Sequence, residues 1–228
     1  MHIPHMERST NQLSYAVKAN KKILDIRMYI LVYIVTMGRK EHFKRDEFMD
    51  AALKMVAQEG PGALTVSALA IGMKAPIGSV YHRFQSRDAL LAELWIRAVE
   101  QFQRGFLEAL ARNGLLASLY TVEWVRKHPN EGRLLLLYRR EEFLSGDWPG
   151  HLKEDVARLS RELDSGIRSF AEKRLGSLTE ETLRRATFAI VDVPLAAVRQ
   201  HLQEGKPPPD IVDELIRATY LAIIRGDK

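Results

Sequence analysis

The sequence predicts an all-α protein of about nine helices, and three observations point to this fold class. Apolar residues recur at three- and four-residue intervals from Phe48 to the C-terminal segment. Glycine and proline separate these periodic segments, as at Gly60-Pro61-Gly62 and again from Gly205 to Pro209. No stretch alternates convincingly between apolar and polar residues, as a half-buried strand would.

The first helix is predicted from about Arg45 to Glu59. Its buried side consists of residues with one helical spacing: Phe48, Ala51, Ala52, Met55 and Val56. Gly60 supplies a left-handed stop, and Thr65 stands where the second helix needs an N-cap. The apolar side of that second helix is predicted to be Val66, Leu69, Ala70 and Met73.

A third short helix is expected to open at Pro76, which lacks only an N–H that would be unpaired there. Val80 and Phe84 are spaced to face inward, and Ser86 is placed to cap a fourth helix. The residues left on or near the outer face are Ile77, Gly78, Ser79, Tyr81 and His82. This is a helix-turn-helix arrangement, which holds one short helix out for the DNA major groove.

Residues 43–91 resemble the DNA-binding domain of the TetR (tetracycline-repressor-like) family of bacterial transcription regulators. The resemblance is carried by Leu64-Thr65-Val66, by the run from Gly78 to Phe84, and by Ser86-Arg87-Asp88-Ala89-Leu90-Leu91. It implies an N-terminal three-helix DNA-binding domain followed by a helical ligand-binding and dimerisation domain. One departure is visible: Lys74 stands where the family usually has a glycine. Either the turn is shifted toward Gly72, or Lys74 is left-handed.

The basic charge lies in the N-terminal half of the chain. Residues 1–36 carry five Lys/Arg and two Asp/Glu, residues 37–113 carry eleven and nine, and the remainder carries eighteen of each. No acidic residue occurs between Lys74 and Arg87. Such a patch suits a phosphate-facing surface, although a merely solvated face would look the same for any one residue.

Ten residues are expected to contact DNA. Ile77, Gly78 and Ser79 would face the bases, Ile77 through thymine methyls and Ser79 through weakly discriminating hydrogen bonds. Phosphate contacts would come from residues at the helix starts and on the outer face: Lys44, Arg45, Thr65, Ser67, Tyr81, His82 and Arg87. The expected partner is double-stranded DNA with a palindromic operator.

Three parts are expected along the chain: residues 1–36 as an extension, 37–86 as the DNA-binding domain and 87–228 as the ligand-binding and dimerisation domain. We interpret Met37 as the true start, followed by a short basic arm. The alternatives are a genuine extension, or a signal peptide, which the absence of a cleavage site disfavours. The apolar run after Arg27 is too short to span a bilayer, so no membrane partner is expected.

Six further helices are expected after Ser86. Their approximate bounds are 87–112, 115–127, 131–144, 151–175, 180–204 and 210–226. Pro194 lies inside the fifth of these and predicts a kink or a break.

The last two helices carry apolar residues around most of their circumference, so they need more than one buried side. By resemblance to the family, the second side would form a homodimer; an internal helix of a monomer is the alternative. The candidate interface residues are Phe188, Val191, Leu195, Val198, Leu215, Ile216, Tyr220 and Ile223. A two-fold dimer would also match a palindromic operator.

The family resemblance implies a cavity for a small-molecule effector in the body. Candidate lining residues are the aromatics of the middle helices: Trp95, Phe102, Tyr120, Trp124, Tyr138, Phe143 and Phe170. Aromatics at helical spacing also occur as plain core, which is the competing interpretation for each of them.

Catalytic and metal-binding motifs are absent from the sequence, so we predict no enzyme, no cofactor and no metal site. Cysteine is absent too, which fits a cytoplasmic protein. The sequence therefore predicts a homodimeric repressor gated by a small molecule. A DNA-binding protein that acts without a ligand is the alternative, and an absent cavity between the fourth and eighth predicted helices would favour it.

Overall fold

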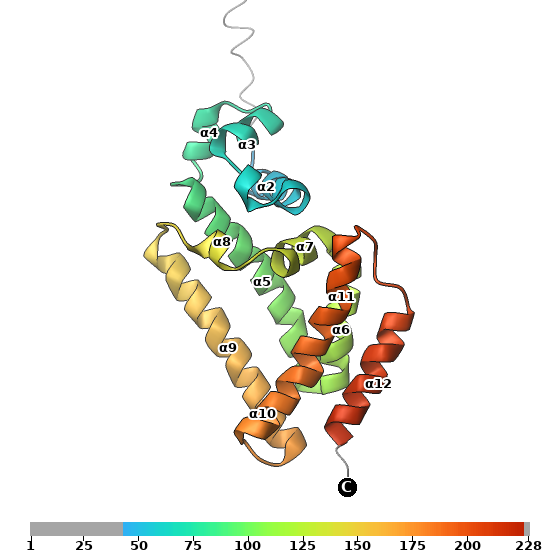
Figure 1. Cartoon of the computed structure of the whole chain (residues 1–228). Coiled ribbons are helices and arrows are strands. Elements are labelled where there is room, and N and C mark those ends of the chain that lie inside the picture. The colour runs from blue at the N-terminus through green and yellow to red at the C-terminus, as the bar shows by residue number, and fades with distance from the viewer. Residues whose placement is uncertain (1–42, 226–228) are drawn as a thin grey trace, which may run out of the picture. The chain divides into compact units, whose positions relative to one another are not determined.

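The computed structural model describes residues 43–225, and these residues form helices and turns without a strand, as predicted (Figure 1). The expectations for residues 1–36 lie outside the described part. We call residues 43–86 the head and residues 87–225 the body. None of the described helices is long and apolar enough to cross a membrane.

The head contains three α-helices and one short 3-10 turn. These are α2 (Arg45–Glu59), η1 (Pro61–Ala63), α3 (Val66–Gly72) and α4 (Ile77–Tyr81). Both predicted caps are present: Thr65 Oγ1 accepts a hydrogen bond from the N–H of Ala68 at 3.0 Å, and Ser86 Oγ accepts one from Ala89 at 3.0 Å. Val80 and Phe84 are buried, as their spacing predicted.

The body is built around α5 (Arg87–Arg112), which packs against α2 of the head and against four body helices. The remaining elements are α6 (Gly114–Lys127), α7 (Pro129–Leu137), α8 (Glu141–Leu144), α9 (Gly150–Leu175), α10 (Glu180–Thr187), η2 (Phe188–Asp192), α11 (Val193–Gln203) and α12 (Ile211–Arg225). In Figure 1, α5 runs from below the head down between α9 and α6. One helix therefore reaches from the head into the depth of the body.

A single hydrophobic cluster joins the head to the upper body. It includes Phe48 and Val80 of the head together with Leu94, Leu134 and Phe143 of the body. Arg133 of α7 adds one polar tie to the head, because its Nε donates to the Ala57 carbonyl at 2.7 Å, while its Nη1 donates to the Leu202 carbonyl of α11 at 2.6 Å. The orientation of the head thus depends on α7 as well as on α5.

The single helix predicted over 131–144 is wrong, because the chain forms α7 and α8 with a break between them. Tyr138 at the break is extended, with φ −113° and ψ 155°. Its ring lies against Gly60, where an added Cβ would stand 3.3 Å from Tyr138 Cε1. This contact with the end of α2 lies 78 positions away in the sequence, so helical periodicity could not reveal it.

The break expected at Pro194 takes the form of one π-helical stretch, η2, between α10 and α11. A proline inside an α-helix removes one hydrogen bond and its ring meets the carbonyl four residues earlier. The wider π turn accommodates that ring, so Pro194 stands in the first turn of α11 and the helical path continues.

Candidate nucleic-acid interface and body pocket

The turn between α3 and α4 is closed by backbone hydrogen bonds around Lys74. The N–H of Lys74 donates to the Ile71 carbonyl at 3.0 Å, and the N–H of Ala75 donates to the Ala70 carbonyl at 2.9 Å. Lys74 adopts φ 53°, which makes it left-handed. This pair of bonds is the Schellman arrangement, whose left-handed position favours glycine. The second of the two alternatives for this turn is therefore the correct one.

The outer side of α4 presents both apolar and polar groups to solvent. Ile77 is 48% exposed and Tyr81 is 58% exposed, while Val80 between them is fully buried. Gly78 and His82 are exposed as well, and Ser79 is half-buried. Ile71 on α3 is a further exposed apolar residue that sequence reasoning did not single out. A short helix with this outer face suits insertion into the major groove.

The groups expected at phosphates near the helix starts lie at the surface. Lys44, Thr65 and Ser67 are exposed. Lys44 precedes α2, and its N–H donates to Glu47 Oε2 at 2.7 Å. Its ammonium group has no ion-pair partner among residues 43–225. Lys44 and Ser67 are thus available to an anionic partner.

Arg83 of the head and Arg87 at the start of α5 both donate hydrogen bonds to the backbone of the head. Arg87 donates through Nε to the Leu64 carbonyl at 2.6 Å and through Nη2 to the Pro61 carbonyl at 2.8 Å. Arg83 donates to the carbonyls of Ser79 and Phe43. These charge-assisted bonds hold the start of α3 and the end of α4 in place. Arg83 and Arg87 therefore position the helix-turn-helix.

Arg45 also has partners within the chain, although its side chain is partly exposed. Its guanidinium lies 4.5 Å from the centre of the Phe84 ring and pairs with the Glu93 carboxylate. Burial raises the pKa of the Glu93 carboxyl, and the neighbouring Arg45 opposes that shift. Arg45 thereby links α2 to α5.

Residues 48–94 match the family model described as "Bacterial regulatory proteins, tetR family". This segment is a TetR-family DNA-binding segment. The resemblance seen in the sequence is thereby confirmed, and members of this family are transcription regulators. No curated protein matches the chain.

Solved structures with the same fold include several TetR-type regulators. The TetR family transcriptional regulator PfmR from Thermus thermophilus superposes with a TM-score of 0.59 at 15% identity, covering 82% of this chain and 98% of that one. The fatty acid degradation regulator FadR from Bacillus halodurans gives 0.60 at 17% identity, covering 82% and 98%. The regulator FadR from Bacillus subtilis in complex with stearoyl-CoA gives 0.58 at 14%, covering 81% and 100%. These likenesses show a shared fold that extends through the TetR-type body.

Most of the aromatics expected to line an effector cavity pack against their neighbours instead. Phe102 lies 5.7 Å from Phe106, 5.8 Å from Tyr120 and 5.0 Å from Trp124, measured between ring centres. Phe143 is buried in the cluster that joins head and body. Trp95 packs against that same cluster and meets the Arg140 guanidinium at 5.3 Å from its ring centre, while Tyr138 covers Gly60.

A pocket of about 990 Å³ lies elsewhere, between α5, α6, α9 and α12 at the end of α5 remote from the head. Phe170 is the one predicted pocket residue that lines it. Tyr120 borders a smaller hollow of about 620 Å³ beside Arg126 and Asp213. The sequence signal that could have located the larger pocket is a row of polar residues at four-residue intervals on α9, which begins at Arg161.

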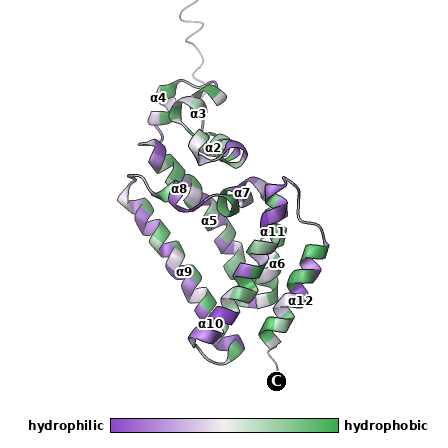
Figure 2. Ribbon diagram, in the orientation of Figure 1, coloured by the Kyte–Doolittle hydropathy of each residue, from purple (hydrophilic) through white to green (hydrophobic). Residues whose placement is uncertain are grey.

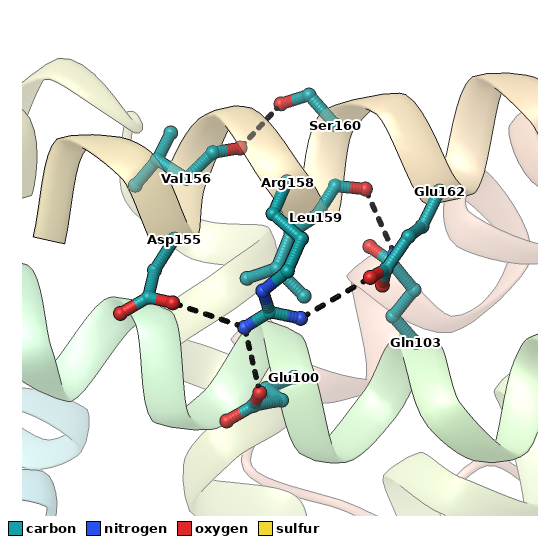
Figure 3. A network of polar contacts seen from close by, with 8 residues as sticks. All are labelled: Glu100, Gln103, Asp155, Val156, Arg158, Leu159, Ser160 and Glu162. Atoms are coloured by element: carbon teal, nitrogen blue, oxygen red, sulfur yellow. Dashed lines mark hydrogen bonds and ion pairs between the residues drawn. The ribbon is translucent and has the colours of Figure 1, made fainter. Parts of the chain in front are cut away.

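A charged network fastens α9 to the middle of α5 (Figure 3). Arg158 of α9 lies 3.0 Å from Glu100 of α5, 3.2 Å from Asp155 and 3.3 Å from Glu162. Gln103 adds a buried bond, because its side chain donates to the Leu159 carbonyl at 2.8 Å. Hydrogen bonds to these carboxylates, first of all Glu100, raise the pKa of Arg158, which stays charged. The network and this bond together connect α9 to α5 at this level.

The candidate dimer residues divide between the inside and the outside of this chain. Val198, Ile216 and Tyr220 are buried in the body core, so they cannot face a partner in this conformation. Phe188 and Leu215 are exposed, and Val191, Leu195 and Ile223 are half-buried. Figure 2 shows apolar residues recurring along α12. The outward residues Ile211, Leu215, Ala218 and Ala222 follow one side of that helix.

Proposed function

We propose that the chain is a homodimeric DNA-binding repressor whose hold on its operator is released by a small molecule bound in the body. The observation that carries DNA binding is the outer face of α4, where Ile77 and Tyr81 stand exposed on a rigidly tied helix. The TetR-type head supports this proposal. A DNA partner places the protein in the cytoplasm.

Within this proposal Ile77, Gly78 and Ser79 read base edges, and Lys44, Thr65, Ser67, Tyr81 and His82 hold phosphates. Arg45 and Arg87 act through the positions of α2 and α3, because Arg45 is paired with Glu93 of α5 and Arg87 donates to backbone carbonyls of the head. We therefore propose Arg45 and Arg87 as positioning residues and no longer as phosphate contacts. The difference is measurable, since a lost phosphate contact lowers the salt dependence of binding and a lost tie lowers stability.

Control by a ligand is supported by the pocket and by the path of α5. The pocket reaches Leu107 and Leu110 at the far end of α5, and the head is attached to the near end. A related fold holds stearoyl-CoA, which agrees with a ligand-binding body. A pocket of this size favours ligand control over DNA binding without a ligand. The ligand can shift the heads only by as much as it prefers one conformation.

A homodimer is supported by the outward apolar residues of α12 and by Phe188. Exposed apolar side chains gathered on neighbouring elements favour association, and a two-fold interface presents the same surface from both subunits. Two heads then meet two half-sites of a palindromic operator.

The experiment begins with selection of binding sites from a random duplex library by the full chain. Fluorescence anisotropy on the selected duplex then compares Tyr81→Phe, Ile77→Ala and Lys44→Ala at several salt concentrations. Tyr81→Phe should weaken binding to all sequences about fivefold, and Lys44→Ala should reduce the salt slope by about one. Ile77→Ala should chiefly relax preference at a thymine position.

Leu116→Ala serves as the matched control, because Leu116 is an exposed apolar residue of α6 in the body. It should bind the selected duplex like the wild type. Failure of the selection to enrich any sequence, or unchanged binding by all three head variants, would contradict the proposed DNA interface.

A further inference from the structure

The large body pocket combines an apolar interior with a charged border. Its apolar wall is formed by Leu107 and Leu110 of α5, Phe170 of α9, and Tyr220 and Leu221 of α12. Tyr220 is buried, and this burial raises the pKa of its phenol. A volume of about 990 Å³ is at the upper end of what ligand pockets offer. The interior can therefore hold a long apolar group.

Four cations stand around this wall: Arg112, Arg161, Lys173 and Arg174. None of them forms an ion pair with a carboxylate within the described part of the chain. One acidic residue, Glu162, also lines the pocket and pairs with Arg158, so four cations face a single carboxylate there.

Several other arginines of the body are paired with carboxylates. Arg126 pairs with Asp213, Arg158 pairs with three carboxylates, and Arg168 lies 2.8 Å from Asp164. Residues 114–228 carry eighteen Lys/Arg and eighteen Asp/Glu, so acidic partners are not scarce. The pocket gathers four cations and one carboxylate, which makes it an electropositive site within a region of balanced charge.

The α9 side of the pocket is a regular polar ridge. Arg161, Ser165, Ser169 and Lys173 follow one another at intervals of four residues, so they line up along one side of the helix. The row has a cation at each end and two hydroxyl groups between them, which can donate and accept hydrogen bonds. An anionic group placed along this ridge would find charge and donors together, beside the apolar wall.

We propose that this pocket binds an amphiphile made of a long acyl chain and an anionic head. The chain would lie against Leu107, Leu110 and Phe170, and the head would lie among Arg161, Lys173 and Arg174. A neutral apolar ligand would leave the like charges uncompensated, and a small anion alone would leave the apolar wall in water. The amphiphile satisfies both parts of the site.

Such a ligand would be well placed to act on the head. Its chain contacts α5, and Glu162 at the pocket is bonded to Arg158, which in turn holds Glu100 of α5 (Figure 3). Ligand binding would therefore shift α5 and α9 together. This regulatory consequence rests on the proposed function, whereas binding itself does not depend on DNA.

Isothermal titration calorimetry on the full chain without DNA tests the binding. The probes, kept below their micellar concentrations, are hexadecanoate, hexadecanoyl-CoA, coenzyme A alone and the neutral glycerol ester of hexadecanoic acid. Hexadecanoate or hexadecanoyl-CoA should bind at least about tenfold more tightly than the neutral ester and than coenzyme A alone. The stronger of the two acyl anions identifies the head group as a carboxylate or a phosphate-bearing group.

Two variants examine the two halves of the site. The double variant Arg161→Gln/Lys173→Gln should weaken the preferred anionic probe about tenfold or more, and Ser169→Phe should exclude the chain by filling the pocket. Arg168→Gln is the matched control, because Arg168 lies on the same helix but pairs with Asp164 and does not line the pocket. A thermal melt of each variant verifies folding.

Equal affinity for neutral and anionic probes, no binding of any probe, or full binding by the double variant would each overturn the proposal. Anisotropy with the selected duplex separates this result from the proposed function. Probe binding without DNA binding would leave the pocket standing and refute the regulator. DNA binding without probe binding would support the DNA-binding regulator and refute the proposed ligand.

Discussion

The head and the lower body employ their basic residues in opposite ways. Arg83 of the head and Arg87 directly after it donate to backbone carbonyls of the head and so hold the helix-turn-helix together. At the far end of α5, Arg161 and Lys173 border a pocket without an acidic partner among the described residues. A basic residue is therefore a candidate ligand contact only where the fold leaves its charge without a partner.

Apolar residues that are neighbours in the sequence also differ, here in their burial. Val80 is buried while its neighbour Tyr81 is exposed, and Ile216 is buried while its neighbour Leu215 is exposed. Each pair differs in the side of the helix that it occupies, so paired substitutions can separate roles in folding from roles in binding.

The largest expected difference is between a buried and an exposed residue of α12. Ile216 is 1% exposed and Leu215 is 59% exposed. Ile216→Asp should prevent folding, since an unpaired buried charge costs several kcal/mol, on the order of the whole stability. Leu215→Asp should fold normally and yield monomers. Circular dichroism melts and sedimentation velocity measure the two effects, and a Leu215→Asp protein that remains dimeric would remove this side of α12 from the interface.

The two kinds of basic residue can be compared directly. Arg87→Ala should lower the free energy of unfolding by about 2 kcal/mol, because it leaves the Leu64 and Pro61 carbonyls without their charged donor. Arg161→Ala should change it by less than about 0.5 kcal/mol. Urea titration measures the free energy of unfolding of both variants. Equal losses would show that Arg87 stabilises the fold no more than Arg161 does.

Helix α4 also offers a buried and an exposed apolar residue for comparison, Val80 and Ile77. Val80→Ala should cost about 2 kcal/mol of stability through lost burial and a small cavity, whereas Ile77→Ala should cost little. The same urea titrations measure both. A large loss from Ile77→Ala would mean that Ile77 belongs to the core of the head and is not free to face DNA.

The smallest expected effect is a gain in stability, at Lys74. Lys74 is left-handed at φ 53°, a conformation that costs a side-chain-bearing residue about 1 kcal/mol. Lys74→Gly should therefore raise the melting temperature by a few degrees, with about 0.5–1 kcal/mol of added stability. Gly72→Ala, at the nearby end of α3 where φ is not positive, provides the comparison. A loss of stability from Lys74→Gly would show that the lysine makes a compensating contact.

Much of the head could be predicted from sequence because its signals are local. The Thr65 and Ser86 caps each bond to an N–H three residues away, and the burial of Val80 and Phe84 follows from helical spacing. The same reasoning misjudged the aromatic residues of the body. Phe102 and Trp124 have the spacing of pocket residues, yet they contact each other and fill the space between them.

The all-α class, the helix-turn-helix and its outward residues follow from local sequence signals, because periodicity and caps act within one or two helical turns. Tertiary structure alone decided which basic residues are free. Arg87 finds its carbonyls 23 and 26 residues away, and Arg133 finds its own 76 and 69 residues away. It also decided where the pocket lies, since α5, α6, α9 and α12 meet there through packing. Such partners depend on which faces come together, and no local preference specifies that.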